Sequence, residues 1–302
     1  MKKFLKVCLI VSGCLILFGG AFLGVTYAIK GPEIVKEVSR ATNGHVSLGW
    51  DNDNWDDADW RKEITGEFQI NDDKAAKANE VTKLDINFGA GVLNIVESND
   101  DYFHINADTS YEYEYGVKNE TFFLKCENDD VKLEGHRNYI QIAIPKNVKL
   151  EEVEIDLGAC DCKIGSLVAK DKVDIELGAG SVEIASVDAK KFKTETGLGA
   201  LTIDSLSVED ADLNVGMGSI EVKGLITGNL DLECGMGSAV VAVNDSEKNH
   251  NYDLSCGFGE LVLGSRSYTN VSHEEKIDNH ANSEYRISCS MGSVVVSFRE
   301  NF

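Results

Sequence analysis

The chain has 302 residues, with 29 Lys or Arg and 51 Asp or Glu, and its formal net charge is -22 at pH 7. Phosphate backbones repel so acidic a chain, which argues against nucleic acid as a partner. With 2 Pro, 28 Gly and no long amphipathic helical pattern after the N-terminus, the composition favours one extended β domain.

The first 30 residues have the pattern of a signal anchor. Residues 7–29 carry no charge, and Lys2, Lys3 and Lys6 precede them. At about 1.5 Å per residue, a helix of this length crosses the roughly 30 Å hydrocarbon core. Because the lysines favour a cytoplasmic N-terminus, we expect a single-pass membrane protein whose C-terminal domain is extracytoplasmic.

Two other interpretations of this segment stay open. Residues 11–14 (VSGC) resemble the lipobox of bacterial lipoproteins, in which Cys14 would become the lipidated N-terminus. The apolar run continues past Cys14 to Ile29, however, whereas a mature lipoprotein normally turns polar there. A cleaved signal peptide is the third possibility.

Residues 31–79 read as an acidic linker. Its centre, residues 50–60 (WDNDNWDDADW), has an Asp spacing that hints at a calcium loop. Trp55 and the lack of a central Gly break the EF-hand pattern, so we expect a solvated tether.

A short phrase, alternating apolar and polar residues followed by Gly-x-Gly, returns along the second half of the chain. It occurs at residues 173–180 (VDIELGAG), 192–199 (FKTETGLG), 211–218 (ADLNVGMG), 230–237 (LDLECGMG) and 252–259 (YDLSCGFG), with looser copies at 84–91 and 285–292. A fixed period near 20 residues with strand alternation is typical of stacked repeats, which bury their apolar sides against one another. The sequence therefore predicts an all-β fold, a parallel β-solenoid of 19–20-residue coils, over residues 80–302.

Residues 81–150 enter this solenoid less regularly. Alternation at 102–107, 121–126, 130–134 and 139–144 predicts strands with some antiparallel pairing that cap the first end. Residues 151–302 form the regular coils, and we expect the polar insertion 264–284 to protect the other end, because an open coil would recruit further strands.

Alternation also assigns side chains to faces. Val173, Ile175, Leu177 and Ala179 are expected inside and the glycines outside, where they permit a sharp bend. Two interior columns follow: the first is Phe88, Leu157, Leu177, Thr196, Val215, Cys234, Cys256 and Cys289, and the second is Ala90, Ala159, Ala179, Leu198, Met217, Met236, Phe258 and Met291. The recurring Gly-x-Gly pairs lack the following helix and the Lys of a phosphate-binding loop.

The cysteines are expected to be free and buried. Cys234, Cys256 and Cys289 fall in one interior column, where a thiol behaves as a small apolar group. A disulfide between adjacent coils is the alternative. Cys160 replaces a second glycine and Cys162 points inward; a C-x-C can bind a metal, but no second pair accompanies it.

Catalytic signals are sparse. The six histidines form no H-E-x-x-H pair, and no G-x-S-x-G elbow is present. We expect no enzyme and no cofactor. A polysaccharide-active β-helix enzyme is the remaining alternative, but such enzymes build a cleft from long loops, whereas coils 153–240 connect through few residues.

One outward feature stands out, a column of acidic residues. It comprises Asp85, Glu154, Asp174, Asp212, Asp231 and Asp253, interrupted by Lys193 and Arg286, with Asp156, Glu176, Glu195, Glu233, Asn87 and Asn214 beside it. Neighbouring carboxylates repel by about 1 kcal/mol per pair even in water. The column is either a solvated face or a weak site for divalent cations or a basic partner, with Asp174, Asp212, Asp231 and Asp253 as the candidate ligands.

The lysine-led anchor, the acidic tether, the strand at residues 140–145 (IQIAIP) leading into 153–158 (VEIDLG), and the Gly-x-Gly coils resemble the putative adhesin family of bacterial envelope proteins. The likeness covers about residues 80–302. It implies β-solenoid domains of unknown biochemical role, often anchored in the bacterial membrane and similar to the outer domains of envelope-stress regulators. No catalytic or binding residues come with it.

We therefore expect a membrane-anchored, non-enzymatic adhesin or cell-envelope scaffold whose partner is an envelope protein or surface ligand. The alternative is an envelope-stress sensor that acts through a membrane partner. A sensor would need its anchor, whereas an adhesin would work as the isolated domain.

Overall fold

The computed structural model describes residues 74–109, 111–126, 138–269 and 272–299. The chain divides into two compact units, residues 1–70 and 71–302, and the described residues belong to the second. The expected anchor, most of the linker and the strand expected at 130–134 lie outside the described residues. Within the described part, no helix is long and apolar enough to cross a membrane.

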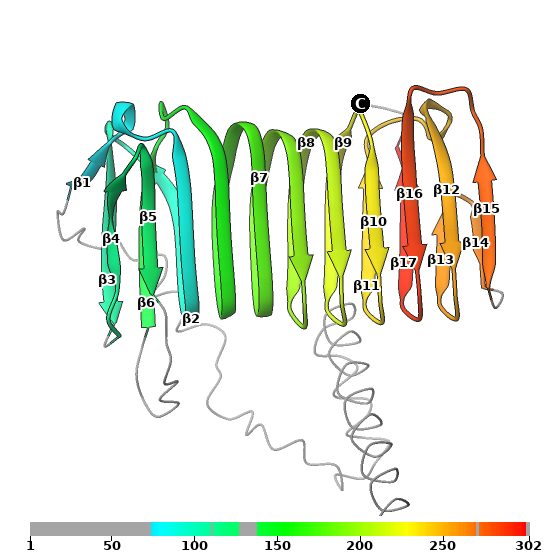
Figure 1. Ribbon diagram of the computed structural model, residues 1–302, viewed down its shortest axis with the longest axis horizontal. Coiled ribbons are helices and arrows are strands. Elements are labelled where there is room, and N and C mark those ends of the chain that lie inside the picture. Colours follow the sequence, from blue (N-terminus) through cyan, green and yellow to red (C-terminus); the bar gives the residue numbers. More distant parts are fainter. Residues whose placement is uncertain (1–73, 110, 127–137, 270–271, 300–302) are drawn as a thin grey trace, which may run out of the picture. The chain divides into compact units, whose positions relative to one another are not determined.

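Seventeen strands of the described residues form one continuous hydrogen-bonded sheet that winds into coils (Figure 1). The strands are β1 Lys74–Lys77, β2 Lys83–Ser98, β3 Tyr102–Thr109, β4 Glu114–Lys118, β5 Thr121–Cys126, β6 Asn138–Pro145, β7 Leu150–Thr196, β8 Ala200–Val215, β9 Ser219–Ile226, β10 Leu230–Cys234, β11 Ser238–Val243, β12 His250–Cys256, β13 Glu260–Leu263, β14 Arg266–Tyr268, β15 His273–Ile277, β16 Ser283–Cys289 and β17 Ser293–Phe298. Two short 3-10 turns, Ala78–Glu80 and Glu247–Asn249, interrupt them. The expected all-β solenoid is confirmed.

The repeated phrase stacks in register. In β7 and β8, Val182 pairs with Leu201 and Phe192 with Ala211, in parallel and 19 residues apart. In β8 and β10, Leu213 pairs with Leu232 in the same way. Equivalent apolar side chains therefore fall on one another in adjacent coils, because each coil repeats the same alternation.

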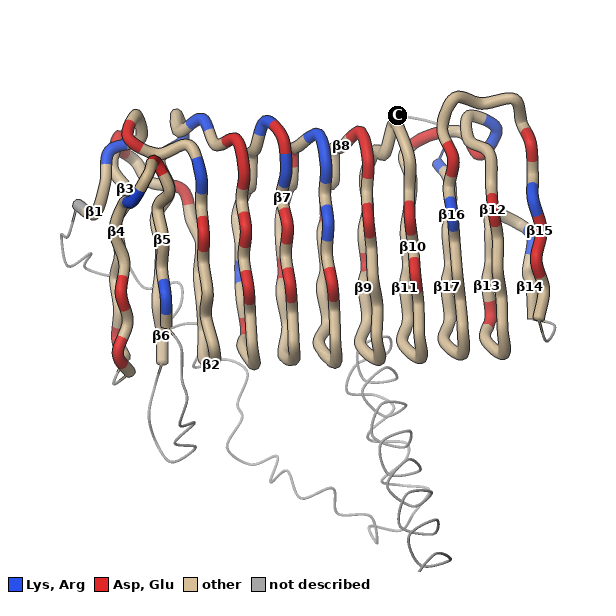
Figure 2. The backbone as a smooth tube through the Cα atoms, viewed as in Figure 1, with Lys and Arg blue, Asp and Glu red and all other residues tan. Residues whose placement is uncertain are grey.

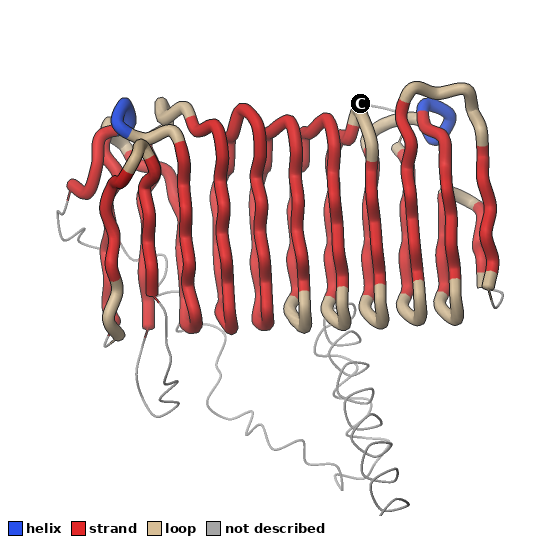
Figure 3. The backbone as a smooth tube through the Cα atoms, in the orientation of Figure 1, coloured by secondary structure: helices blue, strands red, loops and turns tan. Residues whose placement is uncertain are grey.

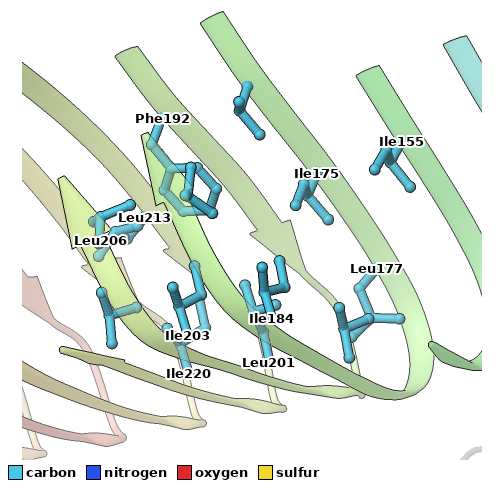
Figure 4. Packing of buried hydrophobic residues seen from close by; sticks show 14 of the residues in the cluster. Ile155, Ile175, Leu177, Ile184, Phe192, Leu201, Ile203, Leu206, Leu213 and Ile220 are labelled. Atoms are coloured by element: carbon cyan, nitrogen blue, oxygen red, sulfur yellow. The ribbon is translucent and has the colours of Figure 1, made fainter. Parts of the chain in front are cut away.

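The core runs through the inside of the stack (Figure 4). Ile155, Ile175 and Leu213 are completely buried, and Figure 4 shows Ile155 and Ile175 on adjacent coils with Leu213 further along the stack. The first interior column is confirmed, since every one of its residues is buried: Phe88, Leu157, Leu177, Thr196, Val215, Cys234, Cys256 and Cys289. A continuous apolar stack is what stabilises coils that could not fold alone.

The second interior column was wrong. Leu198, Met236, Phe258 and Met291 are exposed, and Ala159 is exposed as well. The chain reverses direction over Gly-x-Gly, so strict alternation does not continue through it, and the middle residue lies at the outer corner of the turn. Figure 3 shows these turns along one edge of the stack.

The second glycine of three pairs, Gly199, Gly218 and Gly237, is buried, which corrects the expectation that both glycines of every pair face out. A Cβ on Gly199 would lie 2.6 Å from Leu177 Cδ2, and one on Gly218 would lie 2.1 Å from the carbonyl oxygen of Gly199. Only glycine fits where adjacent turns approach this closely.

The coils near the C-terminal end do not stack in chain order. Strand β16 pairs in parallel with β10 on one side and with β12 on the other. Likewise β17 pairs with β11 and with β13. The last coil of the chain is therefore inserted between two earlier ones, as Figure 1 shows by the red β16 between the yellow β10 and the orange β12.

At the N-terminal end, too, the stacking order differs from the chain order. Strand β2 pairs in parallel with β7 on one side and with β5 and β6 on the other. The first coil of the chain thus lies one coil inside the stack, and the later segment β5 to β6 covers it. Chain order and stacking order differ at both ends.

Antiparallel strands close both ends of the stack. At the N-terminal end, β4 pairs with β5 and β3 with β6, and β1 adds to β3. At the other end, β14 pairs with β13 and β15 with β12. Strands β1, β4 and β14 are short and β15 is strongly charged, which suits strands at the edge of a sheet.

Candidate binding surface

The acidic column is in register on one face of the stack, but basic residues interleave with it (Figure 2). Lys193 pairs with Asp212, Asp212 with Asp231, and Asp231 with Arg286. Arg286 in turn pairs with Asp253, which pairs with Lys276 of β15. Asp231 and Asp253 are therefore not neighbours, because the inserted strand β16 places Arg286 between them.

Most of the four candidate cation ligands already have basic partners. Lys172 Nζ lies 2.5 Å from Asp174 Oδ2, Arg286 Nη2 2.8 Å from Asp231 Oδ2, and Lys276 Nζ 2.7 Å from Asp253 Oδ2. Burial, followed by the charge of Asp231, raises the pKa of Asp212. Over its C-terminal half, basic residues stand on both sides of the adjacent pair Asp212 and Asp231 and on both sides of Asp253, so the column is not a bare ladder of carboxylates.

Asp174 differs from its expected position on a solvated face. Only 9% of it is exposed, and its Oδ1 has no hydrogen-bond partner. Within the described residues, no group of three or more His, Cys, Asp and Glu is close enough to hold a metal ion. The ladder of Asp212, Asp231 and Asp253, on which cation binding depended, does not exist as three adjacent coils.

The excess of negative charge lies instead around Asp156. A shallow groove of about 470 Å³ follows the first glycines of the turns and is lined by Asn87, Asp156, Glu176 and Glu195. We call these four residues the acidic groove. Burial, followed by the charges of Glu176, Glu154, Asp85 and Asp174, raises the pKa of Asp156.

Few cations offset that charge. Lys193 Nζ donates to Glu195 Oε1 at 2.8 Å, but no Lys or Arg of the described residues lies within ion-pair distance of Asp156 or Glu176. The acidic residues around Asp156, whose charges add to the effect of burial on its pKa, would attract a positively charged partner.

A second hollow, of about 780 Å³, opens where the chain passes over the inserted coil. Among its lining residues are Asp245, His250 and Ser283. His250 Nδ1 lies 2.7 Å from Ser283 Oγ, and His250 Nε2 lies 3.3 Å from Asp245 Oδ2. Ser283, His250 and Asp245 are the residue types of a nucleophile, a base and an orienting acid. Their geometry decides whether they could act as a catalytic triad.

The geometry does not fit a nucleophile. The hydroxyl of Ser283 donates to the carbonyl of Asn249 at 3.1 Å, so its proton is directed at that carbonyl and not at His250. His250 is 1% exposed and stacks on Tyr285 at 4.0 Å between centroids. Burial lowers the pKa of His250, with Asp245 acting in the opposite direction. An activated serine needs a base that takes its proton and a path for substrate, and these residues instead fasten β16 to β12.

A second histidine, His104, also has a carboxylate partner. Its Nε2 lies 2.8 Å from Asp100 Oδ1, which also accepts from the backbone N–H of Tyr102 and from Ser98 Oγ. The His104 contact first, and then the other donors, lower the pKa of Asp100 to about 2. This cluster fixes the turn between β2 and β3.

The thiols of the described residues are free and buried, as expected. They are Cys126, Cys160, Cys162, Cys234, Cys256 and Cys289. Burial, followed by the charge of Asp161, raises the pKa of Cys160 to about 12, which disfavours the thiolate that a nucleophilic cysteine requires at neutral pH. The stacking order is Cys234, Cys289, Cys256, so the two thiols that are consecutive in the chain are separated by the third.

Sequence reasoning missed two surface features. The apolar turn residues were assigned to the core because apolar character was taken as a sign of burial. The group at His250 went unnoticed because Ser283 comes 33 residues later. The feature of the sequence that could have indicated this group is the polar insertion at 264–284. It interrupts the repeats, and the last repeat then stacks out of chain order.

Comparisons with known proteins bear on the same residues. A family model described as Toastrack DUF4097 matches residues 81–294. No curated protein matches the chain. The similar solved structures include a putative cell adhesion protein of Clostridium sporogenes, at 16% identity over 75% of this chain and 97% of that one, with a TM-score of 0.30.

Two further structures are both named putative adhesins. The one from Bacteroides fragilis is 14% identical over 74% of this chain and 94% of its own, with a TM-score of 0.37. The one from Parabacteroides distasonis is 16% identical over 71% of this chain and 92% of its own, with a TM-score of 0.39.

Proposed function

Because the chain belongs to the Toastrack DUF4097 family, a putative adhesin-like family of unknown function, we propose that it is a membrane-anchored, extracytoplasmic adhesin or cell-envelope scaffold that binds a partner without catalysis. Residues 7–29 are its anchor in the bacterial membrane, and residues 31–73 tether the solenoid to that anchor. The partner is an envelope protein or surface ligand with a basic surface.

The observation that carries this proposal is the unbroken face around the acidic groove. From Leu150 to Val243 the strands are joined by at most three residues; the joints are residues 197–199, 216–218, 227–229 and 235–237. No loop of this part rises to form a catalytic cleft. Outward side chains repeat once per coil, about 4.8 Å apart, and such a rigid array suits binding.

The charge at Asp156 supports a basic partner. Burial raises the pKa of Asp156, and the charges of Glu176 on the next coil and of Glu154 on its own strand add to this effect. Cationic side chains brought against them would relieve that repulsion, and long-range attraction would speed the encounter. An anionic polymer would be repelled.

The test compares residues 71–302, which form one compact unit, with the full chain. The soluble domain is expected to bind intact cells or envelopes of the producing bacterium. The pair Asp156→Lys and Glu176→Lys should weaken binding at least tenfold, while Asp188→Lys, exposed elsewhere on the stack, should not. Equal loss in both variants would contradict the assignment of the surface.

The same preparations separate an adhesin from the sensor alternative. If crosslinking to a membrane protein requires residues 1–30 and the soluble domain binds nothing, the protein acts as a sensor through its anchor. Retention of the full chain in membranes after alkaline carbonate washing tests the anchor itself. Fatty acid attached to Cys14 would show a lipoprotein instead.

A further inference from the structure

The corners of five adjacent Gly-x-Gly turns form a continuous apolar row. In stacking order the row is Leu198, Met217, Met236, Met291 and Phe258, and we call it the turn ridge. Backbone N–H groups of the ridge donate to the turn of the preceding coil: Met217 to Gly197, Met236 to Gly216, Met291 to Gly235, and Phe258 to Ser290. These bonds hold the five corners in register.

The side chains of the turn ridge are largely exposed, so they do not contribute to the core of the solenoid. Leu198 is 62% exposed, Met291 54% and Phe258 77%. Single exposed apolar residues are common on protein surfaces, but contiguous ones mark an interaction site. At about 4.8 Å per coil, five corners extend over roughly 19 Å.

The edge that bears the ridge is almost free of charge. The residues at and beside the corners read GLGA, GMGS, GMGS, SMGS and GFGE, with Glu260 as the one charged residue among them. Figure 2 shows uncharged turns along this edge, whereas both basic and acidic residues lie along the opposite edge. Within the described residues, this acidic chain thus has a margin that is apolar and almost free of charge.

We propose that the turn ridge inserts into the interfacial region of the lipid bilayer, between headgroups and acyl chains, so that the solenoid lies edge-on against the membrane. This proposal rests on the membrane anchoring in the proposed function. The lipid is uncharged, because Glu195 and Glu233, three residues before two of the corners, would be repelled by anionic headgroups.

The shape of the ridge favours lipid over a protein partner. An amphipathic helix needs a groove to receive it, and the ridge projects from the turns as a convex row. Two such rows from separate copies would meet along a line and bury little area. A fluid bilayer surface deforms around a row of apolar side chains, as it does around interfacial segments.

Because the chain is already anchored, the small apolar surface of the ridge is sufficient for membrane binding. In the proposed function, only the linker that follows residue 29 separates the solenoid from the anchor, so chain connectivity limits the distance between the solenoid and the bilayer. A domain held this close to the bilayer meets it continually, and a second weak membrane signal then adds to the anchor.

The experiment measures the depth of single indoles in the full chain. Trp50, Trp55 and Trp60 are replaced by Phe, and either Phe258→Trp or Val168→Trp is introduced. Val168 is the matched control. It is 59% exposed, but it lies midway in the sequence between the turns at Gly158 and Gly178 and is not part of the turn ridge. Each chain is placed in phosphatidylcholine vesicles whose acyl chains carry bromine.

The indole of Phe258→Trp is expected to lose at least half of its fluorescence, and that of Val168→Trp almost none. Adding Leu198→Ser, Met236→Ser and Met291→Ser to the Phe258→Trp chain should remove most of the quenching, with an unchanged circular dichroism spectrum. Quenching of both indoles alike, or of neither, overturns the ridge proposal.

A second arm keeps the test independent of the anchor. The same chains carry an N-terminal histidine tag and bind vesicles that contain a nickel-chelating lipid, so the domain stays at the surface even where residues 7–29 do not insert. If alkaline carbonate removes the full chain from membranes, the anchor proposal is contradicted. If the indole of Phe258→Trp is not quenched either in the anchored or in the histidine-tagged experiment, the ridge proposal is contradicted. An unquenched chain that sediments as a dimer, and as a monomer after Leu198→Ser, would assign the ridge to a second copy.

Discussion

Arg286 donates a 2.8 Å hydrogen bond to the carboxylate of Asp231, although 55 residues separate them in the chain. The contact exists because β16 lies directly against β10, where the repeat order would have placed β12. The last coil therefore completes the core on both of its sides, and Tyr285 Oη donates to Ile226 O at 2.9 Å from within that core.

Ending the chain after Asn282 should unfold much more than the residues removed. Without β16 and β17, the strands on either side lose their hydrogen-bonding edges and their apolar cover at once. We expect loss of cooperative melting and rapid proteolysis over residues 230–277. Arg286→Gln is the control: it breaks one exposed ion pair and should cost less than about 1 kcal/mol. A truncated chain that melts within a few degrees of the parent would contradict the inserted position.

Ile175→Asp should place an unpaired charge in the centre of the stack. Ile175 is completely buried, so we expect a loss of roughly 4 kcal/mol or more. Glu176→Ser, the next residue and exposed, should change the free energy of unfolding by about 0.5 kcal/mol or less. Urea denaturation followed by circular dichroism measures both, and equal losses would show that the faces are wrongly assigned.

Gly218→Ala should be costly because its Cβ would lie 2.1 Å from the carbonyl oxygen of Gly199. Adjacent turns would have to separate, and we expect a loss of about 2–4 kcal/mol. Gly165→Ala is the matched control, since its nearest neighbour would be Ile95 O at 3.7 Å. The Gly165 variant should be neutral or slightly stabilised through the unfolded chain. Similar melting temperatures for the two variants would refute close turn packing.

The Asp100 carboxyl should titrate near pH 2. Three donors stabilise its charged form in the folded chain, and its folded pKa of about 2 lies below the ordinary value of 3.8. Its contribution to stability is therefore complete above pH 3.8 and is lost as the pH falls towards 2. Carboxyl chemical shifts measured by NMR against pH should show this midpoint, and His104→Val should move it up towards 3.8. An unchanged midpoint in that variant would exclude His104 as the main cause.

Sequence alternation was sufficient to place the straight parts of each coil. Ile175 and Leu177 were predicted inside and Glu176 outside because a strand turns successive side chains to opposite faces. The rule failed at Leu198 and Phe258, where the chain reverses and an apolar side chain occupies an exposed corner. Periodicity describes strands, and it carries no information about the three residues that join them.

The stacking order could not be predicted from the repeats themselves. The phrases that begin at Leu230, Tyr252 and Tyr285 share one pattern, so each could lie beside either of the others. What decides the order is the route of residues 264–282, which return past β12 to the open edge of β10. The acidic column inherited this error, since Asp231 and Asp253 were expected on neighbouring coils and Arg286 in fact separates them.

The inserted first and last coils restrict how such a chain can change its length during evolution. Strands β2 and β16 both have neighbours on each side, so a coil appended after β17 would find no edge to join. A duplicated unit of 19 residues placed between β7 and β10 would instead find equivalent neighbours above and below it, and both closures would stay intact. Relatives should therefore differ in the number of middle coils while keeping the same crossing of the chain at both ends.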